Sequence, residues 1–532
     1  MALLSHMSIR LPSKRTQLEY ALVFLFTLAL ATFWQFHNAF GDPDGFFHVQ
    51  IAVFLSQGKL ITQMPWMQFT TLTQHFTDQH FLYHVALVPF VKLGNPLWGA
   101  KVATIMFTTA FFLTFHTLAR KLAGRLAPVL TFLLLFSASF TFRLGLIKAN
   151  SLSLIVLLCL VMAVIKGRWK LVIVLQALYV WLYGGWILGI GVIGLYWLLS
   201  IIKVGWKRLC SWKANTAWRL LLASVGGTAL GLVANPYWPH NLYFYWQQII
   251  QIGIINYAGR VNVGAEWLPL NFRDIVFFHL YSLTLVLIIA IFSWKQWQRW
   301  NLTAWWMLIV ALVFFAFTIK SRRYIEFSAP FLLLAAGTLW HQSWPQFSWS
   351  GLWRRFATPA NNSIITPLYT WTFVVLFTPL IICAFVRDTV NVRSWIAQSG
   401  FPMKGLQPEA VWLAQNSQPG DVVFHSDWDL WPMLFYYNQK NYYLVGLDPT
   451  FMYNYNTPLY DTWTSITTAQ TTDHLGVLIA QSFKSRYVLV TNDAHEFIKA
   501  LDNDSSFVLA YQGPSARIYK VNYYQHVEAL PL

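Results

Sequence analysis

Long apolar runs separated by short polar stretches occupy the first 390 positions of the chain. A helix crosses the hydrocarbon core of a bilayer with about 20 apolar residues, and most of these runs approach that length. The runs fall at 18–36, 99–118, 126–141, 151–166, 170–185, 186–203, 219–236, 275–294, 303–319, 324–341 and 366–386. This pattern predicts that residues 1–390 form a polytopic α-helical membrane domain with about 11 transmembrane helices.

The last part of the chain has a different pattern. Short apolar stretches at 421–425, 442–445 and 486–490 have the length and the β-branched and aromatic content of buried strands. Helical stretches at 406–416 and 494–503 alternate with them. Alternation of strands and helices is typical of a layered α/β fold, so residues 391–532 are expected to form an α/β domain outside the membrane.

Basic residues mark one side of the predicted bundle. Arg10, Lys14 and Arg15 precede the first apolar run, and further basic residues recur in alternate loops. Because Lys and Arg gather in cytoplasmic loops, the N-terminus is expected in the cytoplasm of a cell whose plasma (inner) membrane holds the protein. The first run then acts as an uncleaved signal anchor, and residues 37–97 and 237–274 become external loops. The same alternation of loops places the C-terminal domain on the extracytoplasmic side.

The composition agrees with a membrane protein and limits other functions. The chain is 56% hydrophobic and 11% charged, whereas soluble chains average about 25% charged residues. The net charge of +17 is explained by the cytoplasmic loops. No basic face with interleaved stacking residues occurs outside them, so nucleic acid is not an expected partner. Cys159, Cys210 and Cys383 lack metal-ligand spacing and are interpreted as small apolar residues.

The predicted external loops contain charged groups that a membrane surface does not require. The acidic and histidine members are Asp42, Asp44, His48, Asp78, His80, His84 and Glu266. The basic members are Arg143, Lys148, Arg260, Arg322 and Arg323. Basic residues on the outer side need a reason, and an anionic headgroup such as a phosphate is the physical candidate. Arginine offers a planar donor fork for phosphate, and lysine adds a compact charge.

Two local patterns each allow two interpretations. Asp44 and His48 share a helix face if a helix begins after Asp44, but Asp44 could also be no more than the cap of that helix. Asp78, His80 and His84 have a spacing that suits a metal ion, because His residues four positions apart converge on one side of a helix. Histidines without any ligand are also common at membrane interfaces.

Five short motifs together resemble the GT-C superfamily of membrane glycosyltransferases, and in particular the catalytic subunit of oligosaccharyltransferase and its bacterial single-subunit counterparts. Asp44-Gly45-Phe46-Phe47-His48 is similar to the family's Asp-Pro-Tyr-Tyr-His run. Arg323, seven residues before Pro330, is similar to an arginine at the same distance from a proline. The other motifs are Tyr183-Gly184-Gly185-Trp186, Gly264-Ala265-Glu266-Trp267 and Ser426-Asp427-Trp428-Asp429-Leu430, the last resembling the WWDYG signature.

The resemblance implies roles for these residues. It nominates Asp44 as the catalytic carboxylate, with Asp42 beside it and Glu266 assisting, and it implies that Arg323 lies near a polyprenyl phosphate. Arg322, Lys148, Arg143 and Arg260 are the further candidates for binding the donor phosphate. Trp428 and Asp429 are expected to contact the acceptor. The family's carboxylate also coordinates a divalent cation, Mg or Mn, for which the candidate ligands here are Asp44, Glu266, His48, Asp78 and His80.

Two departures from the family pattern leave alternatives open. Residues 143–150 contain no carboxylate where the family has a second acidic pair. Either Asp78, His80 or His84 substitutes as a ligand, or Arg143 and Lys148 act as fixed cations. The WWDYG signature is incomplete, so the acceptor could be a protein, a glycan or a lipid such as lipopolysaccharide.

Two alternatives to a glycosyltransferase are a transporter of lipid-linked anions and a binding or assembly module. A flippase or transporter for a lipid-linked anion would place charges at mid-membrane and show repeated halves. In this sequence the polar residues lie in loops on one side of the membrane, and no repeat is visible. A purely binding or assembly module would leave the external arginines and the long first loop unexplained.

Overall fold

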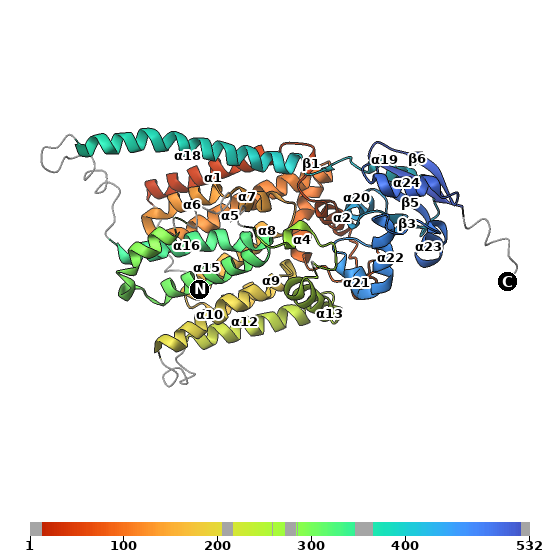
Figure 1. The fold of residues 1–532 in the computed structure, drawn as a ribbon. Helices are drawn as coiled ribbons and strands as arrows, with labels where there is room; N and C mark the ends of the chain where they lie inside the picture. The colour runs from red at the N-terminus through yellow and green to blue at the C-terminus, as the bar shows by residue number, and fades with distance from the viewer. Residues whose placement is uncertain are drawn as a thin grey trace.

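The computed structural model describes residues 13–204, 216–257, 259–271, 284, 286–345 and 365–522. A bundle of helices forms one end of the molecule, and a smaller domain of strands and short helices forms the other (Figure 1). The first loop of the chain, which carries α2 (Asp44–Ser56) and α4 (Phe81–Val91), lies between them. The site described below is at this junction.

The helices of the bundle follow the apolar runs of the sequence. They are α1 (Lys14–Gln35), α5 (Pro96–Ala123), α6 (Ala127–Leu135), α7 (Ala138–Gly145), α8 (Asn150–Ile165), α9 (Trp169–Leu182), α10 (Ile187–Val204), α12 (Thr216–Val233), α15 (Leu302–Lys320), α16 (Ile325–Ser343) and α18 (Ile365–Ala397). Each predicted run overlaps at least one of them, except that the run at 275–294 lies partly outside the described residues. The division expected between residues 390 and 391 falls inside α18.

Fewer helices are both long and apolar enough to cross a membrane than the predicted number of about 11. Among the described residues, four helices meet both conditions: Lys14–Gln35, Pro96–Leu135, Thr216–Val233 and Leu302–Lys320. The bent pair of α7 and α8 counts as a fifth if it is one span. Helix α9 illustrates the difference, since its 14 residues rise about 21 Å, less than the roughly 30 Å of a hydrocarbon core.

The run predicted at 126–141 is not one helix. It is divided between α6 and α7, and α7 then meets α8 at an angle of 110°. Non-helical backbone at membrane depth persists where protein covers it or where it lines a cavity. Here Gln35 Nε2 donates a 2.6 Å hydrogen bond to the carbonyl of Gly145, and Asn150 Nδ2 donates to the carbonyl of Arg143. The break between α7 and α8 is therefore held by side chains, and it delivers Lys148 to the junction.

The first loop is folded and largely buried. It contains β1 (Ala39–Phe40), α2, α3 (Leu72–His75) and α4. Residues 45–52 of α2 are all buried, because the helix packs between α4, α5 and α20 (Trp431–Tyr437) of the C-terminal domain. An interfacial helix would leave a polar face in water, so α2 is a core element of the junction.

The C-terminal domain is built on a five-stranded sheet of order β4-β3-β5-β7-β6. Its strands are β3 (Val422–His425), β4 (Tyr442–Tyr443), β5 (Ser485–Thr491), β6 (Phe507–Gln512) and β7 (Ala516–Val521). Strand β3 is parallel to β4 and β5, whereas β7 is antiparallel to β5 and β6. The helices are α19 (Gln407–Asn416), α20, α21 (Thr450–Tyr455), α22 (Thr457–Thr467), α23 (Leu475–Ser482) and α24 (His495–Asn503). The three predicted strands and two predicted helices are confirmed.

Backbone pairing connects the first loop to this domain. Strand β1 pairs antiparallel with β2 (Phe401–Pro402), directly after α18. Met67 forms a parallel bridge with Tyr443, so the loop extends the sheet beside β4. Because these bonds join distant parts of the chain, α2 is fixed from both sides.

A second loop, between α12 and α15, closes the junction. It contains α13 (His240–Trp246), the π-helix η3 (Gln247–Ile255) and the 3₁₀ helix η4 (Ala265–Trp267). Ser321 Oγ donates to the carbonyl of Glu266 at 3.0 Å, and the amide of Arg322 donates to the carbonyl of Leu268 at 3.1 Å. These bonds attach η4 to the end of α15, where the 3₁₀ helix η6 (Arg322–Tyr324) begins.

Candidate active site

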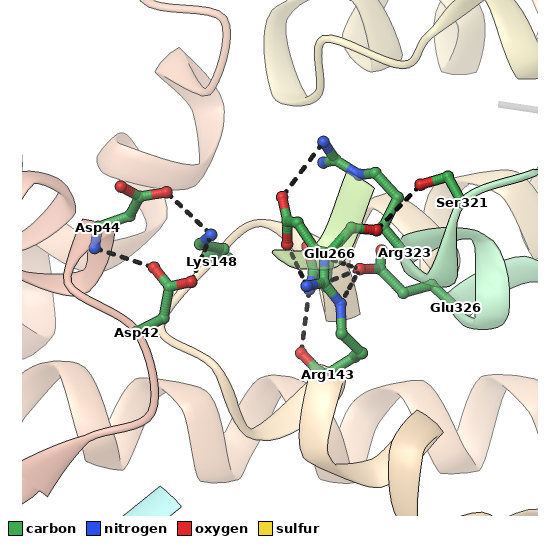
Figure 2. A network of polar contacts seen from close by, with 9 residues as sticks. Asp42, Asp44, Arg143, Lys148, Glu266, Ser321, Arg323 and Glu326 are labelled. Carbon is green, nitrogen blue, oxygen red and sulfur yellow. Dashed lines mark hydrogen bonds and ion pairs between the residues drawn. The ribbon is translucent and has the colours of Figure 1, made fainter. Parts of the chain in front are cut away.

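The acidic end of the site is formed by Asp42, Asp44 and Lys148 (Figure 2). Asp44 is the first residue of α2, and its amide donates to Asp42 Oδ1 at 2.9 Å. The cap position of α2 is held by Pro43 and Asp44 is the first residue of the helix, so the interpretation of Asp44 as only a cap is wrong. Lys148 Nζ lies 2.8 Å from Asp44 Oδ2 and 2.8 Å from Asp42 Oδ2.

The electrostatics of this end keep Asp44 able to take up a proton. Burial raises the pKa of Asp44 to about 6, against the opposing effect of Lys148 and with a further contribution from Asp42. Burial opposes the charge of Lys148, but the two carboxylates raise the pKa of the ammonium above its usual value. Lys148 is therefore a permanent cation, and Asp44 is a carboxylate that titrates close to neutral pH.

The basic end of the site holds Glu266 between two arginines (Figure 2). The guanidinium of Arg143 forms ion pairs with Glu266 and with Glu326, and its Nε donates to Glu326 Oε1 at 2.6 Å. Glu326 is completely buried, and Asn150 Nδ2 donates to the same oxygen at 3.1 Å. A buried carboxylate needs such partners, because water cannot reach it.

Arg323 completes the basic end. Its Nη1 lies 3.4 Å from Glu266 Oε1, and its guanidinium stacks 4.3 Å from the centre of the Trp267 ring. Burial alone would raise the pKa of Glu266. The neighbouring Arg143, followed by Lys148 and Arg323, holds that pKa well below its usual range. Glu266 therefore stays ionised at every physiological pH.

A chain of hydrogen-bonded histidines lies beside the acidic end. His84 Nδ1 donates to Asp78 Oδ2 at 2.6 Å, and His84 Nε2 lies 2.7 Å from His48 Nδ1. Burial lowers the pKa of His48 well below its ordinary value, and burial lowers that of His80 to about 4. His80 Nδ1 hydrogen-bonds to the carbonyl of Leu182 at 3.2 Å.

The side chains expected to bind a divalent cation are engaged with the protein instead. Among the described residues, no three His, Cys, Asp or Glu side chains converge as a group that could hold a metal ion. The candidate ligands Asp44, Glu266, His48, Asp78 and His80 are therefore not gathered into one such group. The physical reason is that a lysine holds Asp44, two arginines hold Glu266, and His84 holds both Asp78 and His48.

Two cavities of different character meet at Arg323. The smaller, of about 110 Å³, is polar and is lined by Asp44, His48, Lys148, Glu266 and Arg323 among others. The larger, of about 660 Å³, runs between α10 and α15 and is lined mainly by apolar side chains. Both are lined by Gln79, His80, Tyr183, Gln248, Trp267 and Arg323. The apolar cavity thus reaches the charged one.

The remaining predicted residues lie around the cluster. Arg322 Nε donates to the carbonyl of Pro269 in the second loop. Arg260 is exposed and lines neither of these two cavities. Trp428 Nε1 donates to the carbonyl of Asn262, so the C-terminal domain contacts the second loop here. Burial, followed by Asp427, Asp42 and Asp44, raises the pKa of Asp429 to about 9.

Two members of the site were not predicted. Glu326 lies at the start of an apolar run and was treated as part of a membrane span. An ionisable residue within such a run is usually functional and paired, and that signal could have identified it. Asn150 opens α8 with a side chain that holds both Arg143 and Glu326, and no sequence pattern distinguishes this role from that of an ordinary helix terminus.

Comparisons with known proteins identify the fold. No protein-family model and no curated protein matches the sequence. The structure resembles the oligosaccharyltransferase of Archaeoglobus fulgidus, with 12% identity, 90% of this chain and 70% of that one covered and a TM-score of 0.64. It also resembles ArnT from Cupriavidus metallidurans, with 15% identity, 96% and 98% covered and a TM-score of 0.54.

A third similar structure is the arabinofuranosyltransferase AftD from mycobacteria, with 13% identity and a TM-score of 0.57. The match covers 96% of this chain and 42% of that one. Identities this low establish the fold and leave the activity to the site itself. The protein is a polytopic helical membrane protein with the GT-C fold that these three transferases share.

Proposed function

We propose that the protein transfers a sugar or oligosaccharide from a polyprenyl-phosphate or polyprenyl-diphosphate donor to an acceptor at the extracytoplasmic face of the plasma (inner) membrane. One observation carries the proposal: an apolar cavity of about 660 Å³ ends at Arg323, where a polar cavity begins that contains Asp44. A donor of this kind has the same division, with an apolar chain joined to a phosphate and a sugar.

The apolar cavity suits a flexible hydrocarbon chain. Its walls come from α10 and α15, and Gly191 and Gly194 lie along the α10 wall. A Cβ atom at either glycine would meet no other atom within 4 Å, so the missing side chains widen the cavity. Apolar surface on this scale gains free energy when it covers a hydrocarbon chain.

The polar cavity suits the head of the donor. Arg143 already balances two carboxylates and Lys148 two others, which leaves Arg323, with its single 3.4 Å ion pair, as the cation best placed to bind phosphate. Its stacking on Trp267 holds the guanidinium plane, which favours bidentate contact with phosphate oxygens.

The transfer step follows from this placement. A nucleophilic oxygen or nitrogen of the acceptor forms a bond to C1 of the sugar. The bond from C1 to the phosphate oxygen breaks, and its electron pair leaves with the polyprenyl phosphate or polyprenyl diphosphate. Asp44 accepts the proton that the nucleophile loses, for which a pKa of about 6 is well matched. Arg323 stabilises the charge that develops on the leaving phosphate.

Structures with the same fold support the proposed donor class. The structure of ArnT was determined with undecaprenyl phosphate, and one structure of the Archaeoglobus fulgidus enzyme contains a dolichol-phosphate and an inhibitory peptide. The acceptor is the finer part of the proposal. A protein acceptor follows from the resemblance to oligosaccharyltransferases. A glycan or lipid acceptor follows from the departures from the WWDYG signature, where Asp427 replaces a tryptophan and the final Tyr-Gly is missing.

A binding experiment tests the donor site. Purified full-length protein in detergent should bind undecaprenyl phosphate, and Gly191→Leu, which fills the cavity, should weaken binding about tenfold or more. Gly226→Leu is the matched control, because Gly226 on α12 also has open space around its Cβ position but does not line the cavity. Arg323→Ala should weaken binding similarly, with the exposed Lys320→Ala as its control.

Equal binding by all four variants and the wild type would overturn the proposed site. Binding without release of polyprenyl phosphate from a sugar-linked donor would favour a carrier of lipid-linked anions over a transferase. Mass spectrometry of surface proteins and glycolipids from cells that lack the protein then identifies the acceptor, as the class that loses its glycan.

A further inference from the structure

The position between Asp42 and Asp44 is occupied by an ammonium group. Lys148 Nζ lies 2.8 Å from one carboxylate oxygen of each residue. Two carboxylates from one short loop are the ligands by which Mg²⁺ or Mn²⁺ is usually held, at about 2.0–2.2 Å. Here the same oxygens face a side chain of the protein, so the two negative charges are balanced without an added ion.

The backbone is built to bring this lysine to the carboxylates. Lys148 belongs to the non-helical residues between α7 and α8, where the chain turns by 110°. A continuous helix would carry the side chain away from the first loop. The hydrogen bonds from Gln35 to Gly145 and from Asn150 to Arg143 fix both sides of the break. The lysine is thus delivered by tertiary structure and is not a mobile surface residue.

The rest of the cluster leaves no place for a metal ion. Glu266 is held by Arg143 and Arg323, and Glu326 by Arg143 and Asn150. In the described part of the chain, no group of three potential ligands is available near these carboxylates or elsewhere. Cations of the protein therefore occupy both ends of the site.

We infer that the ammonium of Lys148 takes the place that a divalent cation would occupy between Asp42 and Asp44. The protein then binds no catalytic metal and works without one. An ammonium has three N–H donors, of which Asp42 and Asp44 take two. The third is left for an oxygen of the donor in the polar cavity that Lys148 lines. The part of this inference that concerns transfer rests on the proposed function, whereas the part that concerns metal binding does not.

The direct test measures Mn²⁺ binding to full-length protein by electron paramagnetic resonance, with no substrate present. The wild type is expected to bind no Mn²⁺ at the site. Lys148→Ala removes a cation from between two carboxylates, and it should tighten Mn²⁺ binding by at least about tenfold. Lys320→Ala removes an exposed lysine whose ammonium donates to the carbonyl of Ile254, and it should leave Mn²⁺ binding unchanged.

The second test measures transfer in the presence of EDTA. Wild-type transfer should not change, whereas Lys148→Ala should lose about a hundredfold in rate and regain part of it when Mn²⁺ is added. Stoichiometric Mn²⁺ binding by the wild type would overturn the inference. So would loss of wild-type transfer in EDTA with recovery on adding Mn²⁺.

The two tests also separate this inference from the proposed function. If the wild type binds no Mn²⁺ and Lys148→Ala does, but no donor is ever turned over, the proposed function fails and the inference about the lysine stands. If Lys148→Ala does not fold, the wild-type measurements still decide the inference, and Lys148→Gln provides a second neutral variant with more of the side chain retained.

Discussion

Asp44 and Glu266 line the same small cavity but have different partners. Asp44 shares the ammonium of Lys148 with Asp42, so two carboxylates divide one cation. Glu266 is in contact with two guanidinium groups, from Arg143 and Arg323. The two ends of one ion-pair network therefore differ in the ratio of cations to carboxylates.

The pKa values of the two carboxyl groups diverge for this reason. Burial raises the pKa of Asp44 to about 6, and one shared lysine does not cancel the effect. Burial acts on Glu266 as well, but its cationic neighbours hold its pKa well below the usual range. Pairs of acids whose pKa values are pushed apart commonly have different roles in a mechanism. Asp44 is suited to accept a proton, and Glu266 is suited to orient arginines.

The largest expected effect comes from removing the proposed base. Asp44→Asn should lower kcat for transfer of a labelled sugar by about 10²–10⁴-fold, because general-base catalysis contributes on that scale. Asp42→Asn is the control. It keeps a side-chain oxygen that can accept the hydrogen bond from the Asp44 amide, and it removes only the negative charge of Asp42. An equal loss in the two variants would show that the acidic pair acts as a unit and that Asp44 is not the single base.

The next effect is on stability and concerns the basic end. Arg143→Met leaves Glu326 buried without its cation, and it should lower the free energy of unfolding by about 3–5 kcal/mol. Arg143→Met combined with Glu326→Gln should recover most of that loss. Lys148→Met should have a smaller effect, because Asp42 and Asp44 are 21% and 22% exposed and water can reach them. Unfolding in detergent micelles, followed by circular dichroism, measures the three differences.

A smaller effect is expected when the orienting carboxylate loses its charge. Glu266→Gln should raise KM for the donor about tenfold, because Arg323 loses the ion pair that directs its guanidinium to the phosphate. The value of kcat and its dependence on pH should change little. A fall in kcat as large as that of Asp44→Asn, with a shifted pH profile, would instead assign the proton transfer to Glu266.

The last prediction is a pH dependence of stability that arises from Asp429, beside the acidic end. The pKa of Asp429 in the folded protein is about 9, above that of an ordinary aspartate, so the folded state keeps a proton that the unfolded state has lost. Stability therefore falls as pH rises from about 4 to about 9, by at most about 1.4 kcal/mol per pH unit for one proton. Asp429→Asn should remove this slope. An unchanged slope in thermal unfolding between pH 6 and 9 would contradict the assignment.

The sequence patterns located much of the fold and the identity of the main site residues. Apolar runs placed the membrane helices because a bilayer demands a fixed length of apolar helix, and three short motifs brought Asp44, Glu266 and Arg323 into consideration. The structure brings these three into one cavity wall. Strand β3 and helix α19 were also predicted, since their apolar residues show local patterns.

Features that depend on tertiary contacts could not be predicted from local sequence patterns. The loop between the predicted runs at 126–141 and 151–166 was expected to carry Lys148, but the 110° bend between α7 and α8 that brings Lys148 to Asp44 has no local sequence signal. The pairing of Arg143 with Glu326 joins residues 183 positions apart. The candidate metal ligands do not form one group, because tertiary contacts pair Asp44 with Lys148 and Glu266 with Arg143.

The ladder between β1 and β2 also imposes an order on biogenesis. It pairs Ala39 with Pro402, and at about 5–20 residues per second roughly 20–70 s pass between the synthesis of the two strands. Asp44 and Lys148 are both made early and can meet while the ribosome is still working. Arg323 and the C-terminal domain arrive later, so a chain that stops before β2 exposes an acidic loop and an unpaired strand edge. An unpaired edge of this kind is a template for pairing with another chain, so an incomplete chain would be prone to aggregate.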